Sequence, residues 1–129
     1  MVIDTSAIIA IIADEPTADD LTVRIARAAV PEMSVVSYVE AATVLLARNI
    51  SPDRLDTLLI RLGISVVDVD VVQGRAAVRA RIAYGKGTGH PAKLNLGDTF
   101  TYALAKVRGA PLLFVGDDFA HTDLVSALA

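Results

Sequence analysis

The sequence predicts an α/β fold, a three-layer sandwich in which helices cover both faces of a central parallel sheet. Short apolar runs that suit buried strands alternate along the chain with longer segments of helical apolar spacing, as is typical of parallel sheets. The strand runs are continuously hydrophobic, as expected of strands buried on both sides. With 129 residues, 53% of them hydrophobic, the chain is sized for a single domain over residues 1–129.

The first strand and the first helix meet at an acidic residue. Residues 2–3 are Val and Ile, which favour a short buried strand, and Asp4 ends that run. Thr5 and Ser6 offer hydroxyls at which a helix can begin, and residues 7–13 are apolar on every side. Asp4 therefore lies where a buried strand leaves the sheet, the edge at which α/β sheets bind ligands. On its own, the residue is also explained as a helix N-cap.

Residues 17–69 are predicted to add three helices and two strands. Ser37 and Glu40 match a Ser-x-x-Glu capping box, a signature of a helix start. The Ser-Pro pair at residues 51–52 puts a cap before a proline at the first helical position, and Gly63 suits a helix end. In chain order, we expect a helix over residues 17–30, a strand over 33–37, and helices over 37–47 and 52–62, followed by a strand over 64–69.

The last third of the chain adds two longer helices and one strand. Apolar residues recur at helical spacing over residues 71–84, and the Gly-Ala-Pro sequence at residues 109–111 ends the last long helix. In chain order, we expect a helix over residues 71–84, a loop over 85–91, a helix from 95–98 to 108, a strand over 112–115, a turn over 116–119 and a short helix over 122–125.

Composition and charge narrow the class of protein. The absence of cysteine excludes a disulfide framework and a thiolate metal site. No stretch approaches the ~20 apolar residues of a transmembrane helix, and the start lacks the basic flank of a signal peptide, so we expect a cytoplasmic protein. The net charge of −3 argues at first against a nucleic-acid partner. If five acids share one cleft, however, the remaining surface carries ten acids against twelve Lys and Arg.

Those acids stand where the chain enters or leaves regular structure. Asp4, Glu40 and Asp117 each follow an expected strand, and Asp118 is adjacent to the last of them. Asp98 starts the last long helix, just before the fourth strand. Because the carboxyl ends of parallel strands share one edge of a sheet, we expect these carboxylates to converge there.

Each acid alone has a structural explanation as a cap, a first-turn acid or a turn residue. Together they are harder to explain, because two carboxylates ~4 Å apart repel by ~4 kcal/mol at an effective dielectric of ~20. The residues beside them in the sequence include no Lys or Arg. A hard divalent cation, Mg²⁺ or Mn²⁺, is the natural counter-ion for a set of oxygen ligands. Such an ion activates water and stabilises charge at phosphorus, so the acids predict phosphodiester hydrolysis.

Four motifs carry a resemblance to a known family. They are MVIDTSA at residues 1–7, SYVEA at 37–41, LNLGDTFTYALA at 94–105 and PLLFVGDDF at 111–119. In this order and over nearly the whole chain, the set resembles the PIN-domain nucleases, and more narrowly the VapC toxins of bacterial toxin–antitoxin pairs. The resemblance implies a PIN-like sandwich and a Mg²⁺-dependent RNA endonuclease. It also implies a homodimer held inactive by a cognate antitoxin protein.

The resemblance further implies a role for each acid. It places the metal on Asp4 and Asp98 and adds Glu40 and the Asp117–Asp118 pair as further catalytic acids. Of that pair we favour Asp117, because it comes first after the strand, with Asp118 as the alternative. The cation would lower the pKa of a water that attacks the phosphodiester in line.

Two rival functions differ in class. A phosphatase with Asp4 as covalent nucleophile is disfavoured, because the haloacid-dehalogenase signature needs a second Asp where this chain has Ser6. The other rival is a catalytically silent RNA-binding or protein-interaction domain on the same fold. Retention of all the acids argues against it, since a silent site has no need to bear their repulsion. A metal-dependent nuclease assay separates these possibilities.

The loop over residues 85–91 leaves two interpretations open. Its glycines and Lys86 suggest a phosphate loop, but the G-x-x-x-x-G-K-[ST] pattern is absent. With Lys93 just beyond it, the loop is either a basic contact for RNA or an ordinary surface loop. His90, beside a proline, is better explained as an exposed loop residue than as a general base.

Overall fold

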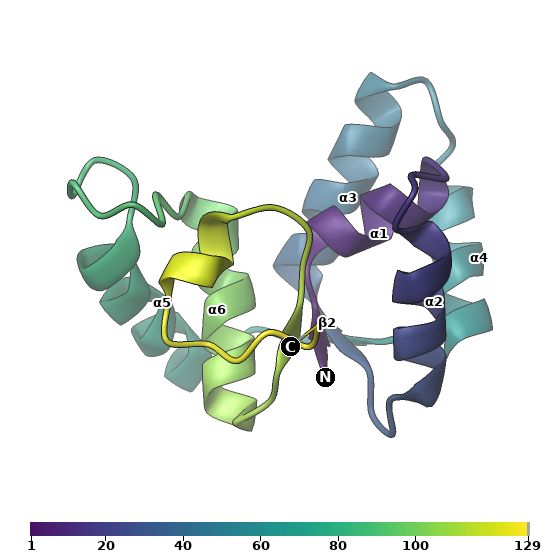
Figure 1. Cartoon of the computed structure of the whole chain (residues 1–129). Coiled ribbons are helices and arrows are strands. Elements are labelled where there is room, and N and C mark those ends of the chain that lie inside the picture. Colours follow the sequence, from purple (N-terminus) through teal and green to yellow (C-terminus); the bar gives the residue numbers. More distant parts are fainter. Residues whose placement is uncertain (129) are drawn as a thin grey trace.

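Four parallel strands form the centre of the computed structural model, which describes residues 1–128 (Figure 1). Their order across the sheet is β3-β2-β1-β4, and Val2 of β1 lies opposite Glu32 on one side and Leu112 on the other. The predicted parallel α/β sandwich is confirmed. The strands are β1 (Val2–Ile3), β2 (Glu32–Ser34), β3 (Ser65–Val67) and β4 (Leu112–Leu113).

Six α-helices and one 3₁₀ helix surround the sheet in the described part of the chain. Figure 1 shows α5 and α6 on one side of the strands and α1, α2 and α4 on the other. Among these helices, none combines the length and apolarity that crossing a bilayer requires. The helices are α1 (Thr5–Ile12), α2 (Ala18–Arg27), α3 (Val35–Ala47), α4 (Asp53–Leu62), α5 (Val71–Tyr84), α6 (Leu96–Arg108) and η1 (Asp118–His121).

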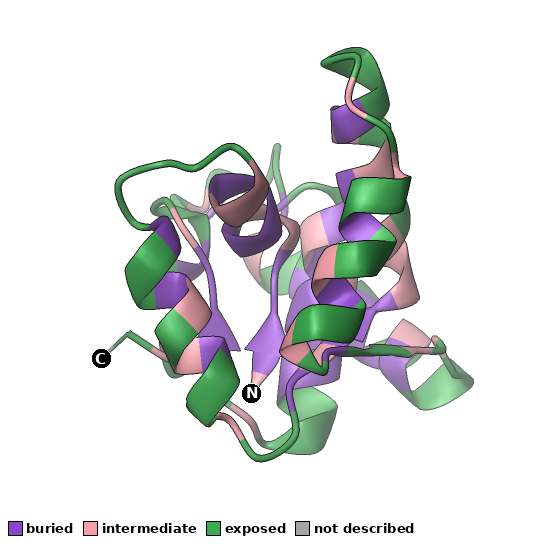
Figure 2. Ribbon diagram, turned by 90° about the vertical axis from the view of Figure 1, so that its right-hand side faces the viewer, coloured by how far each residue is buried: buried purple, intermediate pink, exposed green. Residues whose placement is uncertain are grey.

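The core lies on both faces of β1, because successive strand residues point to opposite sides. Ile3 packs with the cluster of α1 to α4 that includes Ile8 and Leu55. Val2 packs on the other face with α5 and α6, against residues such as Leu104. Figure 2 shows the strands buried and the outward helix faces exposed. Burying each such aliphatic side chain contributes about 1.5–3 kcal/mol, so the central strands are held from both sides.

The second strand is shorter than predicted, and this changes how Glu40 is explained. β2 ends at Ser34, whose side chain accepts a hydrogen bond from the N–H of Val36 (3.2 Å) and caps α3. Ser37 is therefore inside the helix, and the predicted capping box of Ser37 with Glu40 is wrong. The β-branched residues 35–36 favour a strand, but the serine cap before them starts the helix instead.

The segment after η1 also differs from the prediction. The predicted short helix over residues 122–125 is absent: the chain bends at residues 122–123 and then pairs with β4. The N–H of Leu112 donates to the carbonyl of Val125 (2.9 Å), and the N–H of Ala127 donates to the carbonyl of Leu112 (2.8 Å). An edge strand leaves backbone groups unpaired, and this tail satisfies those of β4.

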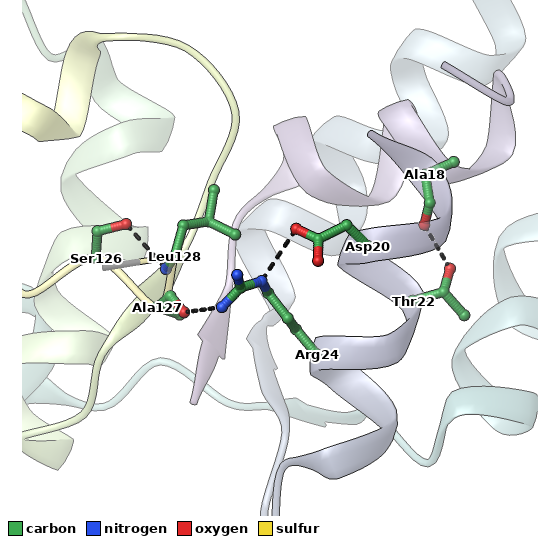
Figure 3. A network of polar contacts seen from close by, with 7 residues as sticks. All are labelled: Ala18, Asp20, Thr22, Arg24, Ser126, Ala127 and Leu128. Atoms are coloured by element: carbon green, nitrogen blue, oxygen red, sulfur yellow. Dashed lines mark hydrogen bonds and ion pairs between the residues drawn. The ribbon is translucent and has the colours of Figure 1, made fainter. Parts of the chain in front are cut away.

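Arg24 fastens the same tail to α2. Its guanidinium donates to the carbonyl of Ala127 (3.1 Å) and pairs with Asp20 one turn earlier (3.1 Å), as Figure 3 shows. The tail thus covers the β4 edge of the sheet and joins it to α2.

Candidate active site

Asp4 lies at the carboxyl end of β1 and is almost fully buried, with 5% of its surface exposed. It caps α1, because its Oδ2 accepts the N–H of Ser6 (3.0 Å). Its Oδ1 accepts the hydroxyl of Thr101 on α6 (3.1 Å). The cap and the site are therefore compatible, since each carboxylate oxygen accepts one hydrogen bond and keeps further lone pairs free.

Two buried hydroxyl groups support Asp4, Thr101 directly and Ser37 through Thr101. Neither was among the site residues predicted from the sequence. The Oγ of Ser37 lies 2.7 Å from the Oγ1 of Thr101, and both side chains are fully buried. Because the single hydroxyl proton of Thr101 goes to the carboxylate, Ser37 donates to Thr101. Ser37 lies three residues before Glu40 and Thr101 three after Asp98. That helical spacing, which puts side chains on one face, is the signal that could have found them.

Glu40 projects from the second turn of α3 and is partly buried. Its pKa is raised to about 7, mostly by burial and also by the charges of Asp4 and Asp98, while a hydrogen bond from Thr5 lowers it. That hydroxyl lies 3.4 Å from Oε1. A Cβ on Gly97 would lie 2.0 Å from Oε2, so only glycine there lets α6 approach the carboxylate this closely.

Asp98 stands in the first turn of α6 and carries the capping box that the sequence assigned to Glu40. Its carboxylate accepts the N–H of Asn95 (3.0 Å), while the Asn95 side chain accepts the N–H of Asp98 (2.8 Å). The pKa of Asp98 is raised to about 6, and burial is the largest cause. The Asn95 hydrogen bond lowers this pKa, and the charges of Asp4 and Asp118 raise it.

The two acids of the last motif lie in different positions. Asp117 precedes η1 and Asp118 is its first residue, and both are exposed. Asp118 is the one whose charge raises the pKa of Asp98. Sequence reasoning favoured Asp117, whereas the electrostatic coupling favours Asp118 as the acid that faces the site.

An apolar groove of about 480 Å³ runs along α3 beside Glu40. The groove is lined, besides Glu40, by Val35, Val36, Val39, Thr43 and Val44.

The negative charge of the site has no basic partner within residues 1–128. The ion pairs there involve Asp20, Glu32 and Asp123, all away from Asp4, Glu40 and Asp98. No group of three or more acidic or histidine side chains in that range is arranged to hold a metal ion by itself. Mg²⁺ keeps several waters and is held through one or two carboxylates plus substrate phosphates. The oxygen donors and raised pKa values therefore fit a two-carboxylate site for a hard divalent cation.

Comparison with known proteins identifies the family. The family model described as PIN domain matches residues 1–125. This chain belongs to the PIN-domain family. It is 48% identical to ribonuclease VapC42 of Mycobacterium tuberculosis over 127 residues, which cover 96% of each chain. The resemblance to the VapC branch of PIN-domain proteins is thereby confirmed.

Solved structures show that the PIN fold extends over nearly the whole chain. The crystal structure of M. tuberculosis VapC20, described as a sarcin–ricin loop cleaving toxin, superimposes with a TM-score of 0.74 at 18% identity and covers 96% of this chain and 95% of that one. A toxin–antitoxin complex from Klebsiella pneumoniae gives a TM-score of 0.71, also at 18% identity, with coverages of 92% and 89%. At these identities, the likeness concerns the fold alone.

Proposed function

We propose that this PIN-domain protein is an endoribonuclease that requires a divalent cation and acts as the toxin of a toxin–antitoxin pair. Relatives named VapC ribonuclease match it at 45–48% identity over almost their entire length. The observation that carries the proposal is the group of three partly or fully buried acids, Asp4, Glu40 and Asp98, without a basic partner in the described residues. A catalytically silent domain gains nothing from that repulsion.

Asp4 and Asp98 are the residues we assign to the cation, Mg²⁺ by preference and Mn²⁺ as an alternative. Their carboxylates come from β1 and α6 and are each oriented by a backbone hydrogen bond, from Ser6 and Asn95 respectively. When bound, the cation supplies Lewis-acid stabilisation of charge at phosphorus and makes a water more acidic.

Glu40 is the residue we assign to proton transfer. A group that accepts a proton from an attacking water works best with a pKa near the working pH, and burial raises that of Glu40 to about 7. Gly97 lets the first turn of α6 approach this carboxylate, so Glu40 and Asp98 are brought together by the packing of α3 on α6. Asp118, or Asp117 in its place, adds an exposed negative charge near Asp98.

The partners follow from the same proposal. The substrate is RNA, and the activity is controlled by a cognate antitoxin, as expected for a cytoplasmic toxin. We also propose a homodimer, on the resemblance to the VapC toxins.

Incubation of the purified protein with total RNA, in Mg²⁺ or in excess EDTA, tests the proposal, with new ends mapped by sequencing. We expect Mg²⁺-dependent internal cleavage that Asp4→Asn abolishes. Binding of RNA without cleavage at any divalent concentration would instead support the silent RNA-binding domain.

A further inference from the structure

Positive charge gathers in one segment of this acidic protein. Residues 71–95, which form α5 and the loop that follows, contain five Lys and Arg residues and no Asp or Glu. The rest of the chain carries seven Lys and Arg against fifteen acids. An anionic partner is therefore attracted to this side of the molecule.

Backbone hydrogen bonds join the two ends of the loop in this segment, here called its neck. The N–H of Lys86 donates to the carbonyl of Leu94 (2.8 Å), and the N–H of Leu94 donates to the carbonyl of Tyr84 (2.9 Å). His90 orders the interior of the loop, because its Nδ1 accepts the N–H of Ala92 (3.1 Å) and its ring packs edge-on against Tyr84 (4.9 Å between centroids). The histidine expected to be merely exposed is a structural part of the loop.

Three cations surround this neck. Lys86 and Lys93 each adjoin one residue of the bridge between Gly85 and Leu94. The side chain of Arg81 lies over Gly85, since a Cβ there would come within 2.2 Å of the arginine Nη1. Arg81, Lys86 and Lys93, here called the neck cluster, are all exposed, and the ion pairs within residues 1–128 involve none of them. Their donors are therefore available to phosphate oxygens.

The neck cluster lies close in the chain to the start of α6, which carries Asp98 of the candidate active site. Leu94 directly precedes Asn95, the cap of α6, and the first turn of that helix carries Asp98. Five residues of fully extended chain span at most ~18 Å, so the backbone at Lys93 lies within that distance of Asp98. Figure 1 shows the loop at the same end of the molecule as the start of α6.

We propose that the neck cluster binds backbone phosphates of the RNA substrate on one side of the acidic site. This inference rests on the proposed ribonuclease function and adds the surface along which the RNA strand runs. The loop over residues 85–91 is made of glycine and polar residues apart from Pro91, so it offers little of the apolar area that anchors a protein partner. Phosphate recognition needs only charge and hydrogen-bond donors, which the three side chains supply.

The test measures RNA binding with cleavage switched off. A fluorescein-labelled single-stranded RNA of mixed sequence is titrated with the Asp4→Asn protein in EDTA, and anisotropy is followed over a range of salt concentrations. In that background, Arg81, Lys86 and Lys93 are all changed to Gln. We expect at least ~10-fold weaker binding at 0.1 M salt and a salt slope smaller by about 2, since each phosphate contact on a single strand contributes ~0.7.

A matched triple variant controls for net charge. Arg27, Arg48 and Arg61 are also exposed and lie outside the basic segment, so their change to Gln removes the same charge elsewhere. We expect it to retain most of the affinity and slope. Equal losses in the two triple variants, or wild-type binding by the neck variant, would overturn the inference.

Different outcomes test the neck cluster and the proposed ribonuclease function. Mg²⁺-dependent cleavage by the wild-type protein together with unchanged RNA binding by the neck variant would refute the neck cluster alone. A wild-type protein that neither binds nor cleaves RNA would refute the proposed function. Circular dichroism melting shows whether the neck variant folds, and the single variants Lys86→Gln and Lys93→Gln, at exposed positions, repeat the test if it does not.

Discussion

Replacing Glu40 with glutamine separates stability from catalysis at this site. Glutamine has nearly the same size as glutamate and fits the space that Gly97 leaves beside α6. It resembles protonated glutamate in carrying no charge, and it cannot accept a proton from water. Because Ser34, and not Ser37, caps α3, the substitution removes no helix cap. We therefore expect a more stable metal-free protein that is a poor enzyme.

The size of the stabilisation follows from the raised pKa of Glu40. A rise from 4.5 to about 7 corresponds to at most about 3–4 kcal/mol at high pH. The side chain is partly exposed, so solvent screening reduces this to ~1–2 kcal/mol. The native state keeps the proton while the unfolded chain ionises, so the wild-type protein loses stability as pH rises from about 4.5 through 7. Glu40→Gln is spared that loss, and its advantage should be full at pH 8 and absent at pH 4.

Urea denaturation of both proteins in EDTA at the two pH values measures the stability difference. RNA cleavage in Mg²⁺ measures the second effect, and we expect a fall of at least ~100-fold, the lower end of what a positioned acid–base group contributes. A stability difference that is the same at pH 4 and pH 8 would show that the charge of Glu40 is not the cause. Wild-type cleavage by Glu40→Gln would remove Glu40 from the catalytic residues.

Three further predictions concern the other acids and their support. Asp118→Asn should reduce cleavage more than Asp117→Asn does, because Asp118 couples to Asp98; the reverse order in rate assays would favour Asp117. Thr101→Val should weaken Mn²⁺ binding in a titration at least several-fold, and Thr101→Ser should restore it, unless the hydroxyl only fills space. Mg²⁺ should raise the melting temperature more at pH 8 than at pH 5.5, because protons compete for Asp98, whose raised pKa is about 6; an equal rise, or one that Asp4→Asn retains, would contradict the metal assignment.

The fold was predictable where one local signal dominates. The helix over residues 71–84 has the predicted bounds, with Asp70 as the cap before it and Gly85 directly after it. Strand ends were less predictable. Residues 35–36 favour a strand by their own propensity. They begin a helix because Ser34, buried at the end of β2, caps α3. The tail beyond Thr122 pairs with β4, and such long-range pairing has no local signature.

The candidate site was predictable as a set of acids, because parallel strands end at one edge whatever their exact bounds. The hydroxyls of Ser37 and Thr101 were not, since Ser and Thr are common residues whose role here depends on the packing of α3 against α6. Which of Asp117 and Asp118 faces the site could not be predicted from their order after the strand. It depends on η1, which begins between them.

In the structure, the capping role predicted for Glu40 belongs to Asp98. This changes how substitutions of the two acids are interpreted. Glu40 loses its capping role, so no local structural need accounts for a half-buried carboxylate that prefers to be protonated near neutral pH. Asp98 gains a capping box with Asn95, so its removal weakens the start of α6 as well as the proposed cation site. Loss of activity in Asp98→Ala is therefore ambiguous, whereas Asp98→Asn retains an oxygen that can accept the N–H of Asn95. Glu40 is the acid at which lost cleavage with retained stability points to chemistry alone.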